Sequence, residues 1–165
     1  MGKKAARSKV TTPATQALQR LGVAVRLHSY DFDPGDFGIG EQAAMALGIE
    51  PARIFKTLIV MIDGKRPAVA LTPVAAETKL KTLAAALGGK RAAMAETSEA
   101  ERLSGYVKGG ISPFGQRQQL EAVVDHSVKD HDTVFVNGGR RGLQIELSPD
   151  DLIRTLGADL ADLAR

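Results

Sequence analysis

The stretch RIFKTLIVMI, residues 53–62, decides the fold, because its pattern predicts a strand that is covered on both faces. Successive side chains of a strand point to opposite faces. One face would carry Ile54, Lys56, Leu58, Val60 and Ile62. The other would carry Phe55, Thr57, Ile59 and Met61. Neither set is polar enough for a fully solvated surface, so the strand belongs inside a packed sheet.

Lys56 is the charged side chain within this apolar strand, and its pattern has two interpretations. Its aliphatic stem could cover apolar surface while the ammonium group reaches water. Alternatively, the ammonium group lies at the rim of a cavity and binds an anionic ligand. A fully buried, unpaired ammonium would be costly to desolvate and would tend to lose its proton. The strand pattern alone leaves both interpretations open.

The residues that follow predict an α+β fold. Asp63-Gly64 is a strong hairpin signal, and it joins the first strand to a second one at 67–72. Further strands are expected at 23–30, with His28 on an exposed face, and at 90–95, 120–125, 133–137 and 142–147. Helices are expected at 11–22, 41–48, 74–89, 97–105 and 148–157, with 158–165 extending the last. Their predicted N-caps include Thr12, Thr97 or Ser98, and Ser148.

Charge is distributed unevenly along the 165 residues. Four of the 22 basic residues lie within residues 1–9, and the remainder, with 18 basic against 19 acidic residues, is nearly neutral. We expect residues 1–10 to form a basic flexible tail, either simply solvated or assisting contact with a polyanion such as RNA. Residues 11–165 are expected to form a single domain. The sequence has neither an apolar run long enough to span a membrane nor a secretion signal, which predicts a cytoplasmic protein.

Several classes of chemistry find little support in the sequence. There is no cysteine, no Gly-x-Ser-x-Gly elbow and no phosphate-loop fingerprint. His126 and His131 lie near Asp125, Asp130 and Asp132, but this cluster is typical of a polar loop between strands. No metal and no cofactor is therefore predicted.

Two glycine-rich segments could instead form a binding site. In YVKGGISPFG, residues 106–115, Gly109 and Gly110 could present backbone N–H groups to an oxyanion. In VNGGRRGLQIEL, residues 136–147, three glycines surround Arg140 and Arg141, whose forked guanidinium groups could grip phosphate. Either segment alone could equally be an ordinary tight turn.

Together these segments resemble the YbaK/EbsC family, free-standing relatives of the editing domain of bacterial prolyl-tRNA synthetase. The resemblance covers Thr12 to about Ala164 and rests on several stretches in the right order. They are TPATQALQRLGV, HSYDFDP, FGIGEQAAMALGI, ARIFKTLIV, VALTPVAAETKLKTLAAALGGK, GYVKGGISPFGQ and GGRRGLQIEL. It implies a mixed, barrel-like sheet surrounded by helices, with the substrate cleft beside the sheet.

The resemblance also implies a set of site residues. The family's essential lysine corresponds to Lys56, with Thr57 after it, and its Gly-x-x-x-Pro loop corresponds to Gly109, Gly110, Ile111, Ser112 and Pro113. The pocket aromatics correspond to Tyr30 and Phe37, and the glycine-rich turn to Gly138, Gly139, Arg140, Arg141 and Gly142. The chain departs from the pattern at Asn137 and Gln144, where a small hydroxyl residue and an acid are expected.

The implied activity is deacylation of mischarged tRNA, with Cys-tRNA(Pro) as the leading substrate and an Ala, Ser or Thr ester as the alternative. Water or the substrate thiol would be the nucleophile, and Lys56 would hold a terminal phosphate or the ester region. A non-catalytic tRNA- or synthetase-binding module is the competing hypothesis. Prolyl-tRNA synthetase is the implied partner. The sequence does not determine the oligomeric state, and a monomer is the working hypothesis.

Overall fold

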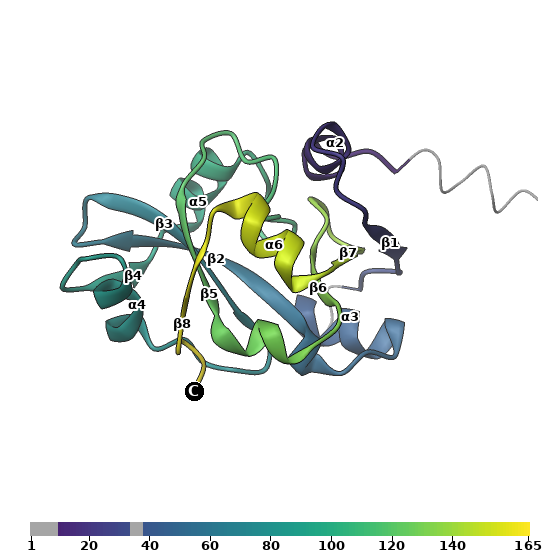
Figure 1. Cartoon of the computed structure of the whole chain (residues 1–165). Coiled ribbons are helices and arrows are strands. Elements are labelled where there is room, and N and C mark those ends of the chain that lie inside the picture. The colour runs from purple at the N-terminus through teal and green to yellow at the C-terminus, as the bar shows by residue number, and fades with distance from the viewer. Residues whose placement is uncertain (1–9, 34–37) are drawn as a thin grey trace, which may run out of the picture.

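The computed structural model describes residues 10–33 and 38–165, which form one mixed sheet with helices packed around it (Figure 1). The helices of this part are α2 (Pro13–Arg20), α3 (Ile39–Leu47), α4 (Leu80–Ala86), α5 (Thr97–Ser104) and α6 (Pro149–Leu156). The strands are β1 (Arg26–Ser29), β2 (Ile54–Ile62), β3 (Arg66–Pro73), β4 (Ala92–Met94), β5 (Glu121–Asp125), β6 (Val134–Asn137), β7 (Leu143–Leu147) and β8 (Asp159–Ala161). Short 3₁₀ turns span Pro51–Arg53 and His126–Asp130.

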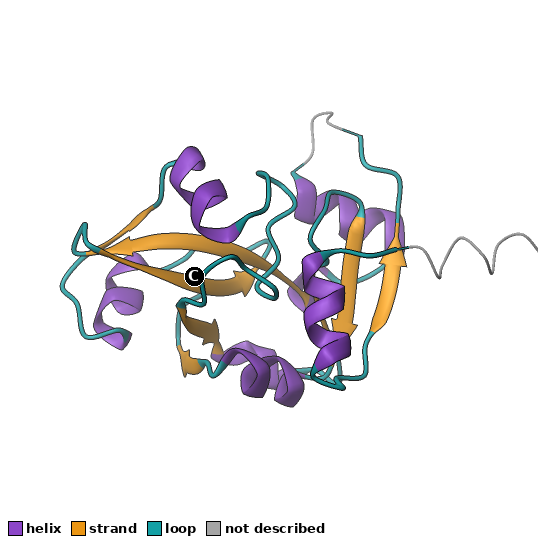
Figure 2. Cartoon of the chain, turned by 90° about the horizontal axis from the view of Figure 1, so that it is seen from above, coloured by secondary structure: helices purple, strands orange, loops and turns teal. Residues whose placement is uncertain are grey.

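The strand order is β1-β7-β6-β2-β3-β5-β8, and β4 pairs with β2 beside this path. The pairs β1·β7, β6·β7, β2·β3 and β2·β4 are antiparallel, whereas β2·β6, β3·β5 and β5·β8 are parallel. In Figure 2 the long β2–β3 hairpin runs across the view, and the strands at the other end of the sheet cross its direction. The sheet therefore turns sharply along its order, and the α+β, mixed-sheet prediction is confirmed.

The hairpin at the centre of the fold follows from local sequence. Asp63 and Gly64 both adopt left-handed backbone angles, with φ of 55° and 69°, which reverse the chain tightly. The Asp63 carboxylate also accepts hydrogen bonds from the N–H groups of Lys90 and Arg91, each at 3.0 Å. These bonds lower the pKa of Asp63 and tie the turn to the start of β4.

The two faces of β2 pack into different clusters, as its alternation predicts. Phe55 and Ile59 join the main core, which the sheet curls around and which α2, α5 and α6 close with Leu18, Leu103 and Leu152. Val60 and Ile62 face the opposite way, against α4 and Leu163. Ile54 lies at the start of the strand, against α3 and Phe135. The core therefore extends on both sides of β2, and Lys56 is the first of three half-buried residues that follow the buried Ile54 and Phe55.

Three predicted elements differ from the structure. The helix expected at 74–89 is confined to Leu80–Ala86. The residues before it are extended instead, because the backbones of Glu77 and Arg165 exchange two N–H to carbonyl hydrogen bonds. The extension expected at 158–165 is wrong, since Gly157 ends α6 in the left-handed region and the chain continues as β8 beside β5. Glu96, rather than Thr97 or Ser98, occupies the N-cap of α5, and Thr97 is its first helical residue.

The first strand is also shorter than expected. It spans Arg26–Ser29 rather than 23–30, and Leu27 is exposed while His28 is half-buried. His28 accordingly packs against the Phe135 ring and lies 2.9 Å from Glu146, so the prediction of an exposed face for His28 is wrong. Thr12 and Ser148 cap their helices as predicted, Thr12 within a capping box.

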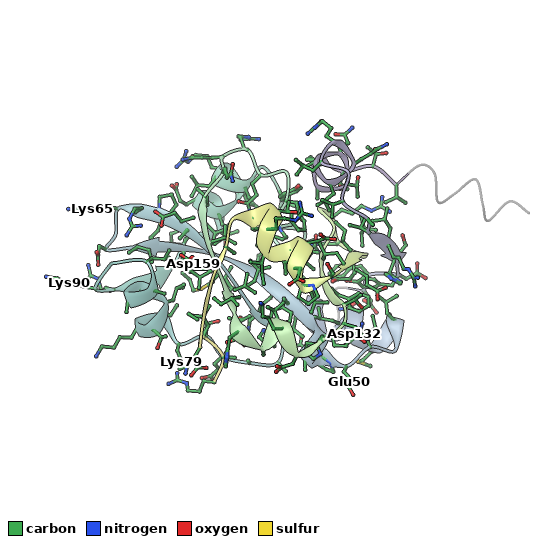
Figure 3. The ribbon with its side chains drawn as sticks, viewed as in Figure 1. Glu50, Lys65, Lys79, Lys90, Asp132 and Asp159 are labelled. Carbon is green, nitrogen blue, oxygen red and sulfur yellow. The ribbon has the colours of Figure 1, made fainter. Side chains whose placement is uncertain are left out.

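The periphery carries charged side chains at both ends of the sheet (Figure 3). Lys65 and Lys90 project from the hairpin end of the molecule, far along the sheet from α3 (Figure 3). No helix in the described ranges is long and apolar enough to cross a membrane. Nine of the ten residues of the predicted basic tail lie outside the described residues, as does Phe37.

Candidate active site

A cavity of about 290 Å³ opens beside β2, at the side that faces β4 and β6. Its walls come from β2, the starts of α3 and α5, the end of β4, the loop before Ile111, and the facing ends of β6 and β7. The lining residues are Ile39, Gly40, Ile54, Phe55, Lys56, Thr57, Leu58, Ile59, Val74, Met94, Ala95, Thr97, Ala100, Glu101, Lys108, Gly109, Ile111, Asn137 and Gln144. Most are apolar, with a few polar groups among them, which is typical of a ligand site.

The cavity exists because two neighbours of β2 diverge. Within the described residues, pairing with β6 ends at Phe55 and pairing with β4 begins at Val60. Ala95 adds one further hydrogen bond, from its N–H to the Ile59 carbonyl at 3.0 Å. Residues 56–58 therefore border an opening in the sheet rather than another strand.

Lys56 lies on the wall of this cavity and is half-buried. Its Nζ donates to the carbonyl oxygen of Ala76, at 2.6 Å, in the turn that follows β3. No carboxylate of the described residues forms an ion pair with it. One neutral acceptor thus positions the ammonium group and leaves its charge without a partner, which is suitable for an anionic ligand.

The loop at 106–115 places Gly109 against the cavity. Its φ is +86°, and a Cβ there would lie 2.3 Å from Ile39 Cδ1, so glycine is needed for both conformation and space. Gly110 is buried behind it, and its N–H donates to the Val107 carbonyl at 2.8 Å. The prediction that the Gly110 N–H is available to an oxyanion is therefore wrong, because a local turn uses that group. Gly109 is the glycine of the pair that lines the cavity.

Behind the loop, several predicted residues are structural. Ser112 is buried and its Oγ accepts the Phe114 N–H at 3.2 Å, while Pro113 is buried beside it. Tyr106 donates its hydroxyl to the Phe114 carbonyl at 2.5 Å, and burial raises the pKa of Tyr106 to about 12. Of the residues Ile111, Ser112 and Pro113, only Ile111 lines the cavity.

The glycine-rich turn at 138–142 supports the site from the other side. The N–H of Gly138 donates to Leu143, and its carbonyl accepts the Thr12 hydroxyl at 2.5 Å. The N–H of Gly139 donates to Asn137 Oδ1 at 2.7 Å. Gly138, Gly139 and the exposed Arg140 do not line the cavity. The residues that line it are Asn137 and Gln144, which lie on either side of the turn.

Two buried side-chain oxygens of the cavity lining lack hydrogen-bond partners, Thr57 Oγ1 and Gln144 Oε1. Thr57 and Gln144 line the cavity, whereas Tyr30 packs against the cluster of α3 and Ile54 behind it. Burial raises the pKa of Tyr30, and the neighbouring Gln144 amide offsets this only in part. Orphan buried polar groups are rare and costly, which marks this corner as a place for ligand atoms.

Sequence reasoning missed two charged lining residues, Glu101 and Lys108. They are linked, since Glu101 Oε2 accepts the Lys108 N–H at 2.8 Å and so fixes the approach of the loop to α5. Lys108 directly precedes the glycine pair, and that adjacency was a usable signal. Glu101 lies in a helix whose orientation depends on packing, and no local pattern marked it.

The histidines and acids form two clusters away from the cavity. Asp125, His126 and Asp162 approach one another closely enough for a metal ion. However, the buried Asp125 carboxylate accepts N–H groups of Ser127, Leu163 and Ala164, and so anchors the C-terminal segment. His28 belongs with Glu146 in a network that also includes Arg53 and Thr133. Both clusters consist of residues outside the cavity lining.

Comparisons with known proteins point to one family. Residues 38–155 match the family described as "Aminoacyl-tRNA editing domain". The chain is 36% identical over 123 residues to "Putative Cys-tRNA(Pro)/Cys-tRNA(Cys) deacylase EbsC" of Enterococcus faecalis, covering 74% of this chain and 75% of that protein. It is 27% identical over 114 residues to "Multifunctional Ser/Thr-tRNA deacylase ProXp-y" of Escherichia coli K12, covering 67% of this chain and 68% of that protein.

A solved structure shares the fold. "Crystal structure of a putative trans-editing enzyme for prolyl tRNA synthetase" superposes with a TM-score of 0.83 at 23% identity, and the match covers 95% of this chain and 99% of that one. The likeness extends beyond the family match into both ends of the described chain.

Proposed function

This chain belongs to the family of aminoacyl-tRNA editing domains, and from that premise we propose that it is a deacylase that clears mischarged tRNA. Its leading substrate is Cys-tRNA(Pro). The observation that carries the proposal is the presence, on one cavity, of a lysine that forms no ion pair with the described residues and of a glycine whose backbone borders the same space. The 36% identity to EbsC, whose name gives Cys-tRNA(Pro), supports the choice of substrate.

The reaction demands little beyond positioning and charge stabilisation, because an aminoacyl ester is already activated. In hydrolysis, water adds to the carbonyl carbon, the bond to the ribose oxygen breaks, and that oxygen takes up a proton. Among the described residues, the cavity lining contains no cysteine, serine or histidine, so the hydroxyl groups of Thr57 and Thr97 have no lining histidine to activate them. This composition fits a mechanism in which water, or the thiol of a cysteinyl substrate, is the nucleophile. With the thiol, a cyclic thiolactone leaves and the tRNA regains its hydroxyl.

Lys56 is assigned to the terminal phosphate or to the ester region, with the phosphate ranked first. A protonated lysine is a compact point charge that suits phosphate oxygens. Its bond to Ala76 uses one of three N–H donors, so two remain to be used by a ligand. Gly109 is assigned as the backbone donor to the oxyanion, because Gly110 donates to Val107 instead.

The other predicted residues divide into two roles under this proposal. Thr57, Ile111, Asn137 and Gln144 contact the aminoacyl group, since they line the cavity. Tyr30, Ser112, Pro113, Gly138 and Gly139 hold those residues in place from behind, and the exposed Arg140 is available to RNA phosphates outside the cavity.

A panel of mischarged tRNAs tests the proposal. Cys-tRNA(Pro), Ala-tRNA(Pro), Ser-tRNA and Thr-tRNA are incubated with the chain, and the loss of each ester is compared with spontaneous hydrolysis. Cleavage of the Cys ester alone, with its thiol-free analogue resistant, supports thiol attack. Cleavage of the Ser or Thr esters supports the alternative that the 27% identity to ProXp-y favours. Binding of tRNA without cleavage of any ester would instead indicate a non-catalytic module.

Selection of a particular tRNA is assigned to a partner, prolyl-tRNA synthetase, on the strength of the family. The nearly neutral body of the chain favours such help. Under this proposal the protein acts as a monomer in the cytoplasm, where its substrate is made. The basic tail would assist, so deleting residues 1–9 should raise the tRNA concentration needed for half-maximal activity at low salt. If this tRNA concentration does not change, the tail makes no contribution to tRNA binding.

A further inference from the structure

The edge of β2 that borders the cavity also exposes backbone N–H and carbonyl groups. In an antiparallel pair, backbone groups of alternate residues point to the partner strand and those between them point away. The Val74 N–H donates to the Ile54 carbonyl at 2.9 Å, so even-numbered residues of β2 face β3. The Ala95 N–H donates to the Ile59 carbonyl, so odd-numbered residues face the opposite edge. The backbone of Thr57 consequently faces the opening between β6 and β4.

Nothing in the strand register pairs with Thr57 on that edge. The bridges to β6 stop at Phe55, and those to β4 start at Val60, within the described part of the chain. The Thr57 carbonyl therefore adds a backbone acceptor to the two side-chain oxygens, Thr57 Oγ1 and Gln144 Oε1, that are buried without partners. Gln144 is only 3% exposed and lines the same cavity. Three oxygens that can accept hydrogen bonds thus belong to two residues that line one cavity, and the Thr57 N–H points to the same edge as the Thr57 carbonyl.

The Lys56 ammonium group is directed away from this corner. Its side chain points to the face of β2 opposite that of Thr57, and its Nζ is held at Ala76. Of the other charged lining residues, Glu101 and Lys108 carry opposite charges, so together they add no net charge beside a cationic group. A group with several donors and a positive charge would satisfy all three acceptors at once, and an ammonium group has three N–H donors.

We infer that the Thr57 carbonyl, Thr57 Oγ1 and Gln144 Oε1 bind the α-ammonium group of the aminoacyl ester. The inference rests on the proposed function and adds to it a requirement for a free α-amine. Lys56 and Gly109 then act on the phosphate and the carbonyl oxygen, while Thr57 and Gln144 orient the acyl group. A neutral amide takes the place at 144 where the family pattern led us to expect an acid.

The test compares two substrates with the same ester. One is the best-cleaved aminoacyl-tRNA of the panel, and the other carries the matched α-hydroxy acid, in which a hydroxyl replaces the ammonium group. Each enzymatic rate is divided by its spontaneous rate, which removes the intrinsic difference in ester reactivity. Wild-type protein should prefer the aminoacyl ester by at least about tenfold, the scale of hydrogen bonds to a charged group.

Variants assign that preference to the named atoms. Gln144→Met keeps the side-chain volume and should reduce the preference to within about threefold of unity, whereas Gln144→Glu should increase it, because a carboxylate pairs with an ammonium group more strongly. Thr57→Val should reduce it in part. Thr155→Val is the matched control, since Thr155 Oγ1 is also buried without a partner but lines a different cavity.

The outcomes separate this inference from the proposed function. If wild-type protein cleaves no aminoacyl ester, the proposed function fails. Equal cleavage of the aminoacyl and hydroxyacyl esters by an active enzyme would overturn the inference alone. The inference is also overturned if Gln144→Met slows both substrates equally, or if Glu101→Gln rather than Gln144→Met removes the preference.

Discussion

Asn137 joins Gly109 through a hydrogen bond in which its side-chain Nδ2 donates to the glycine carbonyl at 3.1 Å. The same side chain accepts the Gly139 N–H through Oδ1 at 2.7 Å. One amide thus connects the two glycine-rich loops and holds the Gly109 peptide at the cavity. Its role is to position the loop, and the identity of the residue matters because the amide must both donate and accept.

Substitution at 137 should separate positioning from stability. Asn137→Asp keeps the acceptor for Gly139 but removes the donor to Gly109 and places a carboxylate against its carbonyl. We expect kcat/KM for the mischarged tRNA to fall by about 10- to 100-fold, equivalent to about 1.4–2.8 kcal/mol. The loss should be mainly in kcat. A change confined to KM would argue that Asn137 binds substrate without positioning Gly109.

Lys56 is expected to be essential for turnover and dispensable for folding. Lys56→Ala removes a half-buried ammonium group and its bond to Ala76, so the midpoint of thermal unfolding should change by only a few degrees. Deacylation should fall to the spontaneous rate. Lys65→Ala is the matched control, since Lys65 projects from the hairpin turn into solvent (Figure 3). Retained turnover by Lys56→Ala would remove Lys56 from the mechanism.

Gly109→Ala should be more harmful than an equivalent change elsewhere. Alanine at φ +86° is strained by about 1–2 kcal/mol, and its Cβ would lie 2.3 Å from Ile39 Cδ1 and 2.9 Å from Arg141 Nε. The loop must shift, and we expect activity to drop by at least about tenfold. Gly22→Ala provides the control, because its φ of +69° imposes similar strain while nothing lies within 4 Å. Its activity should match that of the wild type.

Asp125 should make stability depend on pH in the acid range. Burial raises the pKa of Asp125, but hydrogen bonds from Ser127, Ala164 and Leu163 outweigh it and hold the pKa below its ordinary value. A carboxyl with a depressed folded pKa stabilises the protein above its unfolded pKa, about 3.9, and loses that contribution as pH falls through the folded value.

Thermal unfolding of Asp125→Asn across pH checks this prediction. Near neutral pH the variant should be less stable by about 1–3 kcal/mol, because a neutral amide accepts the three N–H groups less strongly. The difference from wild type should shrink as pH falls below about 4. A difference that stays constant down to about pH 2 would show that the charge of Asp125 contributes nothing.

Expectations from local sequence were accurate where local physics decides. The hairpin at Asp63-Gly64, the caps at Thr12 and Ser148, and the left-handed Gly48 after α3 all follow from backbone angles and neighbouring polar atoms. The helix predicted at 74–89 was too long because a contact with a residue distant in sequence decides where it begins. Residues 74–79 have no local barrier to a helix, but Glu77 pairs with Arg165, which is distant in sequence.

The candidate site divides in the same way. The strand pattern placed a lysine on β2, and the glycine pairs were visible as turns, so Lys56 and Gly109 could be proposed from these patterns, whereas Asn137 was named only through the family resemblance. The sequence did not show which glycine N–H is free to bind a ligand. In the structure the Gly110 N–H donates to the Val107 carbonyl, whereas Gly109 borders the cavity. Whether Tyr30 lines the site or packs behind it depends on how α3 meets Ile54.

The sequence by itself determined the strands other than β8, most of the helices, the tight turns and the presence of a cation on an apolar strand. These depend on alternation, capping and permitted backbone angles, which act between residues close in the chain. Tertiary structure alone decided that β6 and β4 leave β2 at different points, and so opened the cavity at Thr57. It also decided which buried oxygens remain without a partner, since that depends on contacts between segments far apart in the sequence.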